Sequence, residues 1–403
     1  MTKLEKLIEE LCPNGVEYVR LADVCDEIIV PMRDRPKIFD GNIPWCRIED
    51  IEGKCFNRSL SGLGVSEQII QKMNLKVFPT GTVICSCSAS LGAYAINTQP
   101  LVTNQTFIGL VCDSKLYNKY LLYYMETQTS YLKSQASTGT IPYVSRKKFE
   151  ELLIPLPPLE VQAEIVKILD NFTELTAELT AELTARKKQY EYYRDVLLTF
   201  SDKVPKVKLA DIATDIYRGA GIKRDEVTTD GIPCVRYGEI YTSYDISFTE
   251  CISHTRKEVV KNPKYFEYGD IIFTITGENV EEIAKSIAYL GEEKCMAGGD
   301  TVVMKHEQEP RYISYALSTT NAQAQKSKGK VKSKVVHSSV PALKEIEIPL
   351  PNMETQRKIA DLLDNFHKLC NDISEGLPAE IEARRKQYEY YRDKLLTFKE
   401  VKA

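Results

Sequence analysis

Two arginines stand at matching places in the chain, each just after an Ile-Pro pair: Arg47 in "IPWCRIEDI" and Arg236 in "IPCVRYGEI". The segment "TNQT" adds two amide side chains, Asn104 and Gln105. Arginine suits guanine edges and phosphates, whereas asparagine and glutamine pair with adenine. These residue types predict contacts with DNA, although a single arginine in a hairpin is more often part of a surface salt bridge.

Two glycine-containing loops carry further groups of this kind. The first is "ASTGTIPYVS" (136–145), rich in serine and threonine, and the second is "KSKGKVKSK" (326–334), with five lysines and no acid. A lysine run is most often a solvated loop, but hydroxyl and ammonium groups also suit phosphate and base-edge contacts. With two basic residues near "YRGAGIK" (217–223), the candidate DNA contacts outside the Ile-Pro and amide segments are Thr138, Thr140, Lys223, Arg224, Lys326, Lys328, Lys330, Lys332 and Lys334.

The elements that must position these residues occur twice. "IPLPPLEVQAEIVKILDNF" (154–172) returns as "IPLPNMETQRKIADLLDNF" (348–366), and "ARKKQYEYYRDVLLTF" (185–200) returns as "ARRKQYEYYRDKLLTF" (383–398). The segments before each copy match only weakly. The repeated identity includes polar positions that a core would not constrain, so we expect two identical partners to dock on two copies of one surface; slow sequence drift in these segments would leave the same identity.

Each conserved region predicts a long helix. Apolar residues from Val161 to Leu179 are spaced by alternating steps of four and three, which is a heptad seam. The tetrad repeat "TELTAELTAELTA" (173–185) then inserts four extra residues into that pattern. In the second copy, Gly376 and Pro378 predict a local interruption. The spacer and partner interface is expected at Leu175, Leu179, Leu183, Tyr190, Tyr193, Arg194, Tyr388, Tyr391 and Arg392.

The segments before the two helices mix short β-rich runs with one helix each, an α+β pattern. Two long amphipathic helices separated by such a domain can bury each other's stripes as an antiparallel pair with pseudo-two-fold symmetry. The short helix at Leu4 to Leu11 is expected near the C-terminal end. The predicted order is an α+β domain with the short helix (1–157), a helical spacer (158–203), a second α+β domain (204–351) and a second helical spacer (352–403).

Other chemistry finds little support. The sequence has no Walker A motif, no GxGxxG, no NPPY-type tetrad beyond "NPKY" (262–265), and no nucleophile triad. Eleven scattered cysteines and four histidines make no metal-ligand spacing, and reduced thiols are expected in a cytoplasmic protein. No apolar run is long enough to predict a membrane span. A net charge of −4 argues against coating nucleic acid by charge alone. Recognition is therefore favoured over catalysis.

With its duplicated "IPLP…Q…I…LDNF", "RKKQYEYYRD…LL" and TAEL tetrads, the chain resembles the specificity subunits of type I restriction–modification systems. The resemblance implies two target-recognition domains, each reading one half of a bipartite, asymmetric DNA site. It implies docking of two methyltransferase subunits and, where present, two restriction/motor subunits. This chain would then be a non-catalytic subunit without cofactors, while the partners would use S-adenosylmethionine, ATP and magnesium.

Three alternatives stay open from the sequence. The chain could serve a modification-only methyltransferase, bind DNA on its own, or be a self-contained fused methyltransferase, which the missing motifs disfavour. Within the leading interpretation the tetrads set length, because each adds about 6 Å of helix. One tetrad should then change the tolerated DNA spacer by about one to two base pairs, at about 3.4 Å per pair.

Overall fold

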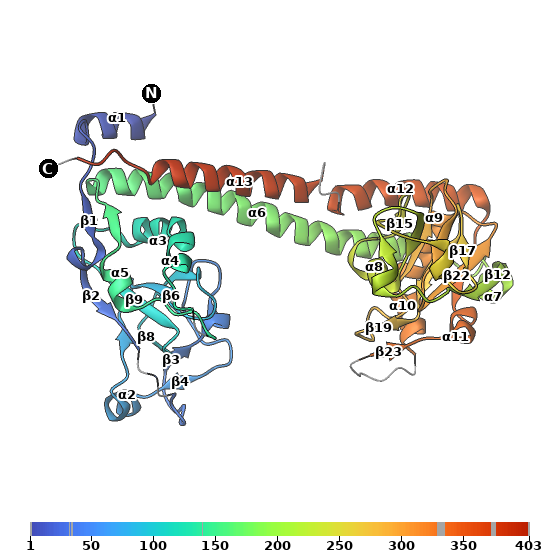
Figure 1. The fold of residues 1–403 in the computed structure, drawn as a ribbon, viewed down its shortest axis with the longest axis horizontal. Coiled ribbons are helices and arrows are strands. Elements are labelled where there is room, and N and C mark those ends of the chain that lie inside the picture. The colour runs from blue at the N-terminus through green and yellow to red at the C-terminus, as the bar shows by residue number, and fades with distance from the viewer. Residues whose placement is uncertain are drawn as a thin grey trace. The chain divides into compact units, whose positions relative to one another are not determined.

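The computed structural model describes residues 2–31, 33, 35–138, 140–328, 335–371 and 376–401. Packing divides the chain into two units, one formed by Met1–Glu178 with Ile381–Ala403 and the other by Leu179–Glu380. Both units mix strands and helices, so the α+β prediction is confirmed (Figure 1). The four-segment order along the chain stays a prediction, since packing groups each domain with parts of both conserved helical regions.

The first unit is built on two four-stranded sheets. One has the strand order β2-β9-β6-β7 and the other β4-β3-β8-β5, while β1 (Tyr18–Arg20) pairs with β10 (Leu153–Pro155). The strands of the two sheets are β2 (Cys25–Ile29), β3 (Ile43–Cys46), β4 (Gly64–Val65), β5 (Val77–Phe78), β6 (Val83–Ser86), β7 (Tyr94–Ile96), β8 (Leu101–Thr103) and β9 (Phe107–Cys112). The unit's shorter helices are α1 (Lys3–Leu11), α2 (Glu67–Met73), α3 (Asn118–Thr127), α4 (Thr129–Ser134) and α5 (Arg146–Glu150).

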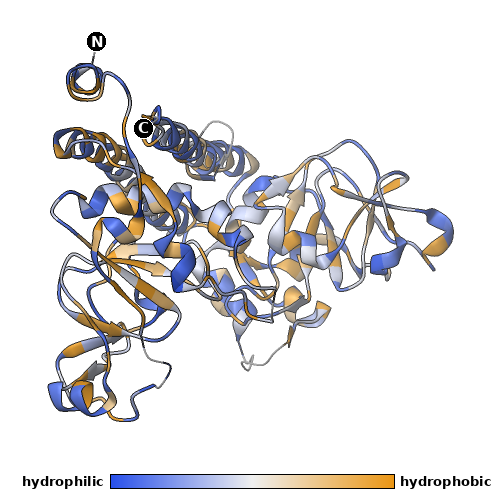
Figure 2. Cartoon of the chain, turned by 60° about the vertical axis from the view of Figure 1, so that its left-hand side comes forward, coloured by the Kyte–Doolittle hydropathy of each residue, from blue (hydrophilic) through white to orange (hydrophobic). Residues whose placement is uncertain are grey.

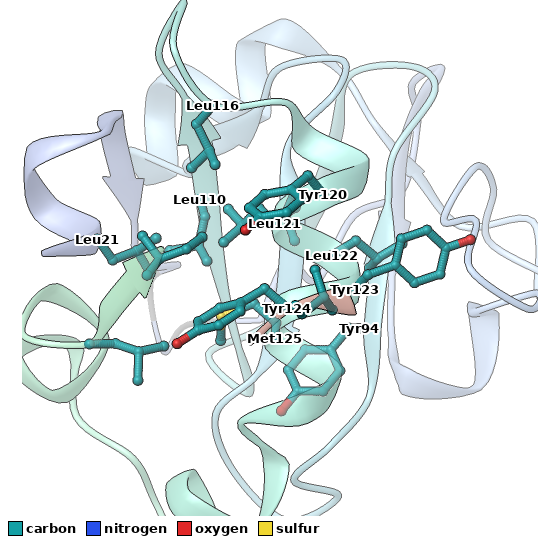
Figure 3. Packing of buried hydrophobic residues seen from close by; sticks show 14 of the residues in the cluster. Leu21, Tyr94, Leu110, Leu116, Tyr120, Leu121, Leu122, Tyr123, Tyr124 and Met125 are labelled. Atoms are coloured by element: carbon teal, nitrogen blue, oxygen red, sulfur yellow. The ribbon is translucent and has the colours of Figure 1, made fainter. Parts of the chain in front are cut away.

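Helix α3 is the centre of the first core, and six successive residues from Tyr120 to Met125 are buried (Figure 3). Such all-round burial requires neighbours on every side. Contacts to β6 and β7 cover one side. On another side, the Tyr123 hydroxyl donates to the Asp170 carboxylate of the long helix at 2.6 Å. The core therefore joins the sheet to the conserved helical region.

The second unit repeats this plan with two five-stranded sheets. Their strand orders are β12-β22-β18-β20-β15 and β13-β16-β14-β21-β17. Two further pairs are β11 (Lys206–Lys208) with β24 (Glu347–Pro349), and β19 (Thr276–Gly277) with β23 (Val336–His337). The strands of the two larger sheets are β12 (Ala213–Arg218), β13 (Val227–Thr228), β14 (Ile232–Val235), β15 (Ser247–Phe248), β16 (Ser253–Thr255), β17 (Tyr265–Phe266), β18 (Ile271–Thr274), β20 (Ser286–Tyr289), β21 (Cys295–Ala297) and β22 (Thr301–His306). Its shorter helices are α7 (Leu209–Ile212), α8 (Tyr237–Thr242), α9 (Pro310–Ser318), α10 (Thr320–Ser327) and α11 (Val340–Lys344). In Figure 2 apolar residues gather on the strands of the sheets, whereas the long helices alternate apolar and polar residues along their length.

The long helices are shared between the units. Helix α6 (Leu159–Leu197) is one continuous helix of 39 residues, as predicted, and its first half belongs to the first unit. There it runs alongside α13 (Leu377–Leu395) in the opposite direction (Figure 1), with the Phe172 and Tyr391 rings stacked at 5.5 Å. In the second unit the other half of α6 packs on α12 (Met353–Asn371), where Tyr193 stacks on Phe366 at 6.2 Å.

The second conserved region is two helices where the first is one. Helix α12 ends at Asn371 and α13 begins at Leu377. Pro378 lies in the first turn of α13, where its missing N–H costs no helical hydrogen bond. The expected interruption near Gly376 and Pro378 is confirmed. The short helix α1 also lies where it was expected, because Lys3 pairs with Glu164 at 2.5 Å and the following segment pairs with the C-terminal end at Val16.

Equivalent residues make equivalent contacts in the two units. Buried Gln162 donates to the Pro157 carbonyl at 2.8 Å, and buried Gln356 donates to the Pro351 carbonyl at 2.8 Å. Likewise Tyr123 donates to Asp170 at 2.6 Å, as Tyr315 does to Asp364 at 2.7 Å. The sequence repeat is therefore a structural repeat, in which the same side chains join each domain to its helices. In the described part of the chain, no helix has the length and apolar character needed to cross a membrane.

Candidate nucleic-acid interface

The loops that carry the candidate residues of the first unit converge on one edge. Ser86, at the end of β6, pairs with Phe107 at the start of β9, and Ile29, at the end of β2, pairs with Gly109. In the second sheet, Cys46 and Thr103 are paired at the parallel ends of β3 and β8. Three residues separate Thr103 from Phe107. The segments that follow β2, β3, β6 and β8 therefore lie together.

The second unit has the same edge. Arg218 pairs with Val302 where β12 ends and β22 begins, and Thr274 pairs with Thr301. Val235 and Ala297 are paired where β14 and β21 end. The segments after β12, β14, β18 and β21 consequently meet as their counterparts do in the first unit. Each unit thus has a cluster of four loop segments at corresponding strand ends. We call the cluster of the first unit the first recognition edge and that of the second unit the second recognition edge.

Arg47 lies on the first edge, directly after β3. Its terminal nitrogen pairs with Glu49 at 2.8 Å, and its backbone N–H donates to buried Asp50 at 2.7 Å. The Arg47 Nε atom is buried and has no hydrogen-bond partner in the described part of the chain. Arg47 faces a small pocket of about 140 Å³, whose polar lining includes Glu49, Ser88, Ser90, Asn104 and Thr106.

The pocket brings Arg47 together with Asn104, although the two come from separate sequence motifs. The Asn104 Oδ1 atom accepts from the Thr106 backbone N–H at 3.2 Å and from the Thr106 hydroxyl, so it is used inside the loop. Bidentate adenine pairing needs both the oxygen and the nitrogen of an amide. Exposed Gln105 makes no side-chain hydrogen bond to the described residues and is the better placed of the two amides for that role.

The serine/threonine loop reaches the same edge. Ser88 bridges to Tyr143, and the Val144 backbone N–H donates to the Cys87 carbonyl at 2.8 Å. These bonds fix the end of the loop beside the pocket, while Thr138 and Thr140 are exposed. The corresponding segment of the second unit is fixed likewise, because Thr276 pairs with His337.

Arg236 lies on the second edge in a different setting. Its Nε atom donates to the Glu239 Oε1 atom at 2.9 Å, and its backbone N–H donates to Oε2 at 3.0 Å. Glu239 is buried and also accepts from the Ser253 hydroxyl at 2.7 Å. Lys223 and Arg224 are exposed on the loop that follows β12. The edge therefore joins one fixed arginine with several solvated cations.

The sequence analysis missed other basic residues on these edges. Exposed Arg33, Arg35 and Lys37 follow β2, and Arg218, with a side chain 63% exposed, ends β12. The Arg35 guanidinium lies 5.1 Å from the Trp45 ring centroid, a cation–π contact. The signal that could have found them is local charge, since "MRDRPK" and "RGAGIKR" occupy equivalent positions at the ends of β2 and β12.

One candidate is contradicted. Lys326, in α10, is buried, and its Nζ atom donates to the Leu317 carbonyl at 2.8 Å and lies 3.4 Å from the Ser286 hydroxyl. Burial lowers the pKa of Lys326 to about 7. A side chain held inside the domain cannot reach a phosphate. Lys328 is exposed, and Lys330, Lys332 and Lys334 lie outside the described residues.

Comparison with known proteins places this geometry in a family. The family model described as "Type I restriction modification DNA specificity domain" matches residues 13–186 and 202–383. The chain belongs to this specificity-domain family. It is 32% identical over 302 residues to the EcoR124I/EcoR124II specificity subunit of Escherichia coli, covering 71% of this chain and 72% of that subunit. A Haemophilus influenzae chain named for the same class of subunit is 30% identical, with 98% of each chain covered.

A solved structure supports the fold. One chain matches this protein with a TM-score of 0.66 and 18% identity; its structure is titled as the basis of complex assembly and conformational transition of the type I R-M system. The match covers 96% of this chain and 98% of the other. At that identity the likeness concerns the fold, and it agrees with the two copies of the specificity domain.

The conserved helices of this specificity-domain chain use several expected interface residues internally. Tyr190 is buried, Arg194 and Arg392 have side chains only 13% and 16% exposed, and each of these arginines pairs with the next aspartate at under 3 Å. Buried Tyr190 cannot contact a partner directly, which corrects that assignment. Half-buried Tyr388 contacts the first domain, and Tyr391 and Tyr193 stack on phenylalanines.

Only some residues of the repeated helical motif are exposed and available to a partner. Leu175 is 47% exposed, and Leu179 and Leu183 are half-buried. The hydroxyls of Thr176 and Thr184 donate to carbonyls four residues earlier at 2.8 and 2.9 Å, so the helix satisfies them itself. The largest repeated exposed side chains are Tyr192 and Tyr390, which are 64% and 62% exposed at matching positions.

Proposed function

We propose that the chain is the DNA-recognition subunit of a type I restriction–modification complex, in which each recognition edge reads one half of a bipartite, asymmetric site. Two like edges with unlike residues are the observation that carries the proposal. The two domains share one fold, so both can contact DNA in the same way. At matching positions the first edge has Asn104 and Gln105 and the second has Gly298 and Gly299, so the two edges present different side chains. Two unlike readers recognise an asymmetric site.

The conserved helices serve as docking surfaces for two methyltransferase subunits. Exposed Tyr192 and Tyr390 support this role, since each ring leans on the next tyrosine of its own helix, at 5.5 and 5.3 Å, and leaves most of its surface in water. Tyrosine is enriched at interface hot spots. Methyl transfer and cleavage belong to the partners, which would hold S-adenosylmethionine, ATP and magnesium, and the complex would work in the cytoplasm.

Mass measurement of the assembled complex tests the docking. We expect one copy of this chain with two methyltransferase subunits, and one methyltransferase subunit fewer after Tyr192→Ala or after Tyr390→Ala. Tyr268→Ala is the matched control, because Tyr268 is 65% exposed but its counterpart is Thr80. A complex that keeps both partners in the two helix variants would contradict these docking positions.

Mapping of methylated adenines tests the recognition role. DNA from cells that express this chain with its methyltransferase partner should carry methylation at one bipartite sequence. Sequence-specific binding without a partner would favour a stand-alone DNA-binding protein. Methyl transfer by the purified chain alone would refute the non-catalytic role.

Deletion of one tetrad tests the spacer role. Removing Thr180–Leu183 takes one turn, about 6 Å, from α6. The mapped site should keep both half-sites while its spacer shortens by about one to two base pairs. A changed half-site with the old spacer would contradict the role of the tetrads in setting length.

A further inference from the structure

The two recognition edges hold their equivalent arginines differently, and from this difference we infer that Arg236 reads a guanine in the half-site bound by the second domain, with Glu239 as its positioning residue. The inference rests on the proposed function. It goes further by naming the base, the reading atoms and the group that orients them.

The Arg236 side chain is held from one side only. Its Nε atom is bound by Glu239, while its two terminal nitrogens, Nη1 and Nη2, make no hydrogen bond to any described residue. The side chain is 31% exposed. A guanidinium held at Nε keeps its two outer donors parallel and open to solvent. That fork matches the O6 and N7 acceptors of guanine in the major groove.

Glu239 is suited to orient this fork. It is 6% exposed, and both of its oxygens are occupied by the Arg236 backbone, the Arg236 Nε atom and the Ser253 hydroxyl. A carboxylate with these partners cannot swing away with the arginine. Less conformational freedom is then lost when the arginine binds a base.

The backbone beside Arg236 carries a glycine where the first domain has an amide side chain. Gly298 lies beside it, and a Cβ atom at residue 298 would come within 2.6 Å of the Val235 carbonyl oxygen and 3.2 Å of the Arg236 Cα atom. Only glycine lets the backbone pass this close. The matching residue of the first domain is Asn104, whose side chain lines the pocket at Arg47. At this matching position, the second edge therefore has no side chain beside its arginine.

Arg47 does not present the same fork. One of its terminal nitrogens is paired with Glu49 at 2.8 Å, and its buried Nε atom has no hydrogen-bond partner among the described residues. Arg47 is thus held through a terminal nitrogen, whereas Arg236 is held through its Nε atom. A phosphate contact common to both half-sites gives no reason for this difference, whereas reading unlike bases gives one.

The test uses the full chain assembled with its methyltransferase partners and a DNA library in which each half-site is randomised in turn. Wild-type protein should select a guanine at one position of the second half-site. In Arg236→Lys, preference for that guanine should fall roughly 5- to 140-fold, the range expected for one bidentate pair. Lysine keeps the charge but loses the fork, so preferences at the other positions should persist.

Further variants separate positioning from folding. Glu239→Gln should weaken selection at the same position alone, by less than Arg236→Lys, and Glu239→Asp tests the carboxylate at a shorter reach. Arg47→Lys is the matched control and should leave the second half-site unchanged. Far-UV circular dichroism verifies that each variant is folded.

The outcomes distinguish the two levels of the argument. If wild-type protein selects no bipartite sequence, the proposed function fails. If wild-type protein selects such a sequence but Arg236→Lys preserves every base preference, the guanine inference is wrong. A uniform loss of affinity in Arg236→Ala, with full preference in Arg236→Lys, would mean that Arg236 contacts a phosphate. Unaltered selection in both Glu239 variants would remove Glu239 from its positioning role.

Discussion

Tyr388 and Tyr190 occupy the same place in the two copies of the conserved motif, yet their hydroxyls have different surroundings. Tyr388 donates to Glu126 at 2.6 Å and accepts from Lys54 at 2.9 Å, and Lys54 pairs with Glu126 at 2.8 Å. Burial lowers the pKa of Lys54. The Tyr190 hydroxyl is buried and has no hydrogen-bond partner in the described part of the chain.

This difference separates two kinds of contact. The contacts repeated in both units join conserved helices to the strand and helix nearest them, through Gln162 and Gln356 or Asp170 and Asp364. The contacts that differ come from domain residues that are not repeated. The repeated residues thus form one fixed set of contacts between helices and domain, which we call the frame. Each recognition domain adds further contacts of its own to this frame.

Substitution of the repeated glutamines should have the largest effect on stability. Gln162→Ala would leave the Tyr117 N–H and the Pro157 and Lys115 carbonyls without their buried partner. We expect the free energy of unfolding to fall by about 3 kcal/mol or more, since three groups lose their partner and each buried unpaired group costs about 1–3 kcal/mol. Urea unfolding of the first unit can be followed by the fluorescence of Trp45, the only tryptophan in the sequence.

Gln356→Ala provides the matched comparison in the second unit. Gln356 also accepts from the Glu309 N–H at 3.1 Å and donates to the Pro351 carbonyl. Gln356→Ala should lower the free energy of unfolding by an amount similar to that of Gln162→Ala, as measured by circular dichroism during unfolding. A loss confined to one of the two variants would show that the frame is not equivalent in the two units.

The tyrosine pair should respond in opposite ways. Tyr388→Phe removes the hydroxyl between Lys54 and Glu126 and should destabilise the first unit by about 1.5–3 kcal/mol, the range for hydrogen bonds to charged groups. Tyr190→Phe removes a buried hydroxyl that has no partner among the residues the structure describes, so it should be neutral or stabilising by up to about 1 kcal/mol. Equal losses in the two variants would show that Tyr190 has a partner in solution and would weaken the comparison.

Much of the frame could be predicted from the sequence because it is written twice. The repeat located the helices, and Gly376 with Pro378 marked the interruption. The internal use of Tyr190 and Arg194 could not be seen, because polar identity is equally compatible with an outside partner and an inside one. The burial of Lys326 was hidden for the same reason. Its neighbours in sequence are basic, but the contact that buries it comes from Leu317 at the end of another helix.

Buried Lys326 predicts that the stability of the second unit depends on pH. The pKa of Lys326 is about 7 in the folded chain and near 10.5 when exposed. Between these values the unfolded chain holds more protons, so the stability of the second unit rises with pH. From pH 7 to pH 8 the wild type should gain up to about 1 kcal/mol relative to Lys326→Met. Denaturant unfolding at the two pH values measures this difference, and parallel profiles would refute the burial.

The smallest expected effect concerns Lys328, two residues from the buried lysine. Lys328 is exposed, so Lys328→Ala should leave stability unchanged and reduce the slope of log affinity against log salt by about one unit. Lys326→Met should leave that slope unchanged, because its ammonium group lies inside the domain. Binding of site-containing DNA at several salt concentrations compares the two. A reduced slope for Lys326→Met would mean that the buried residue reaches the DNA after all, and an unchanged slope for Lys328→Ala would place that side chain away from the phosphates.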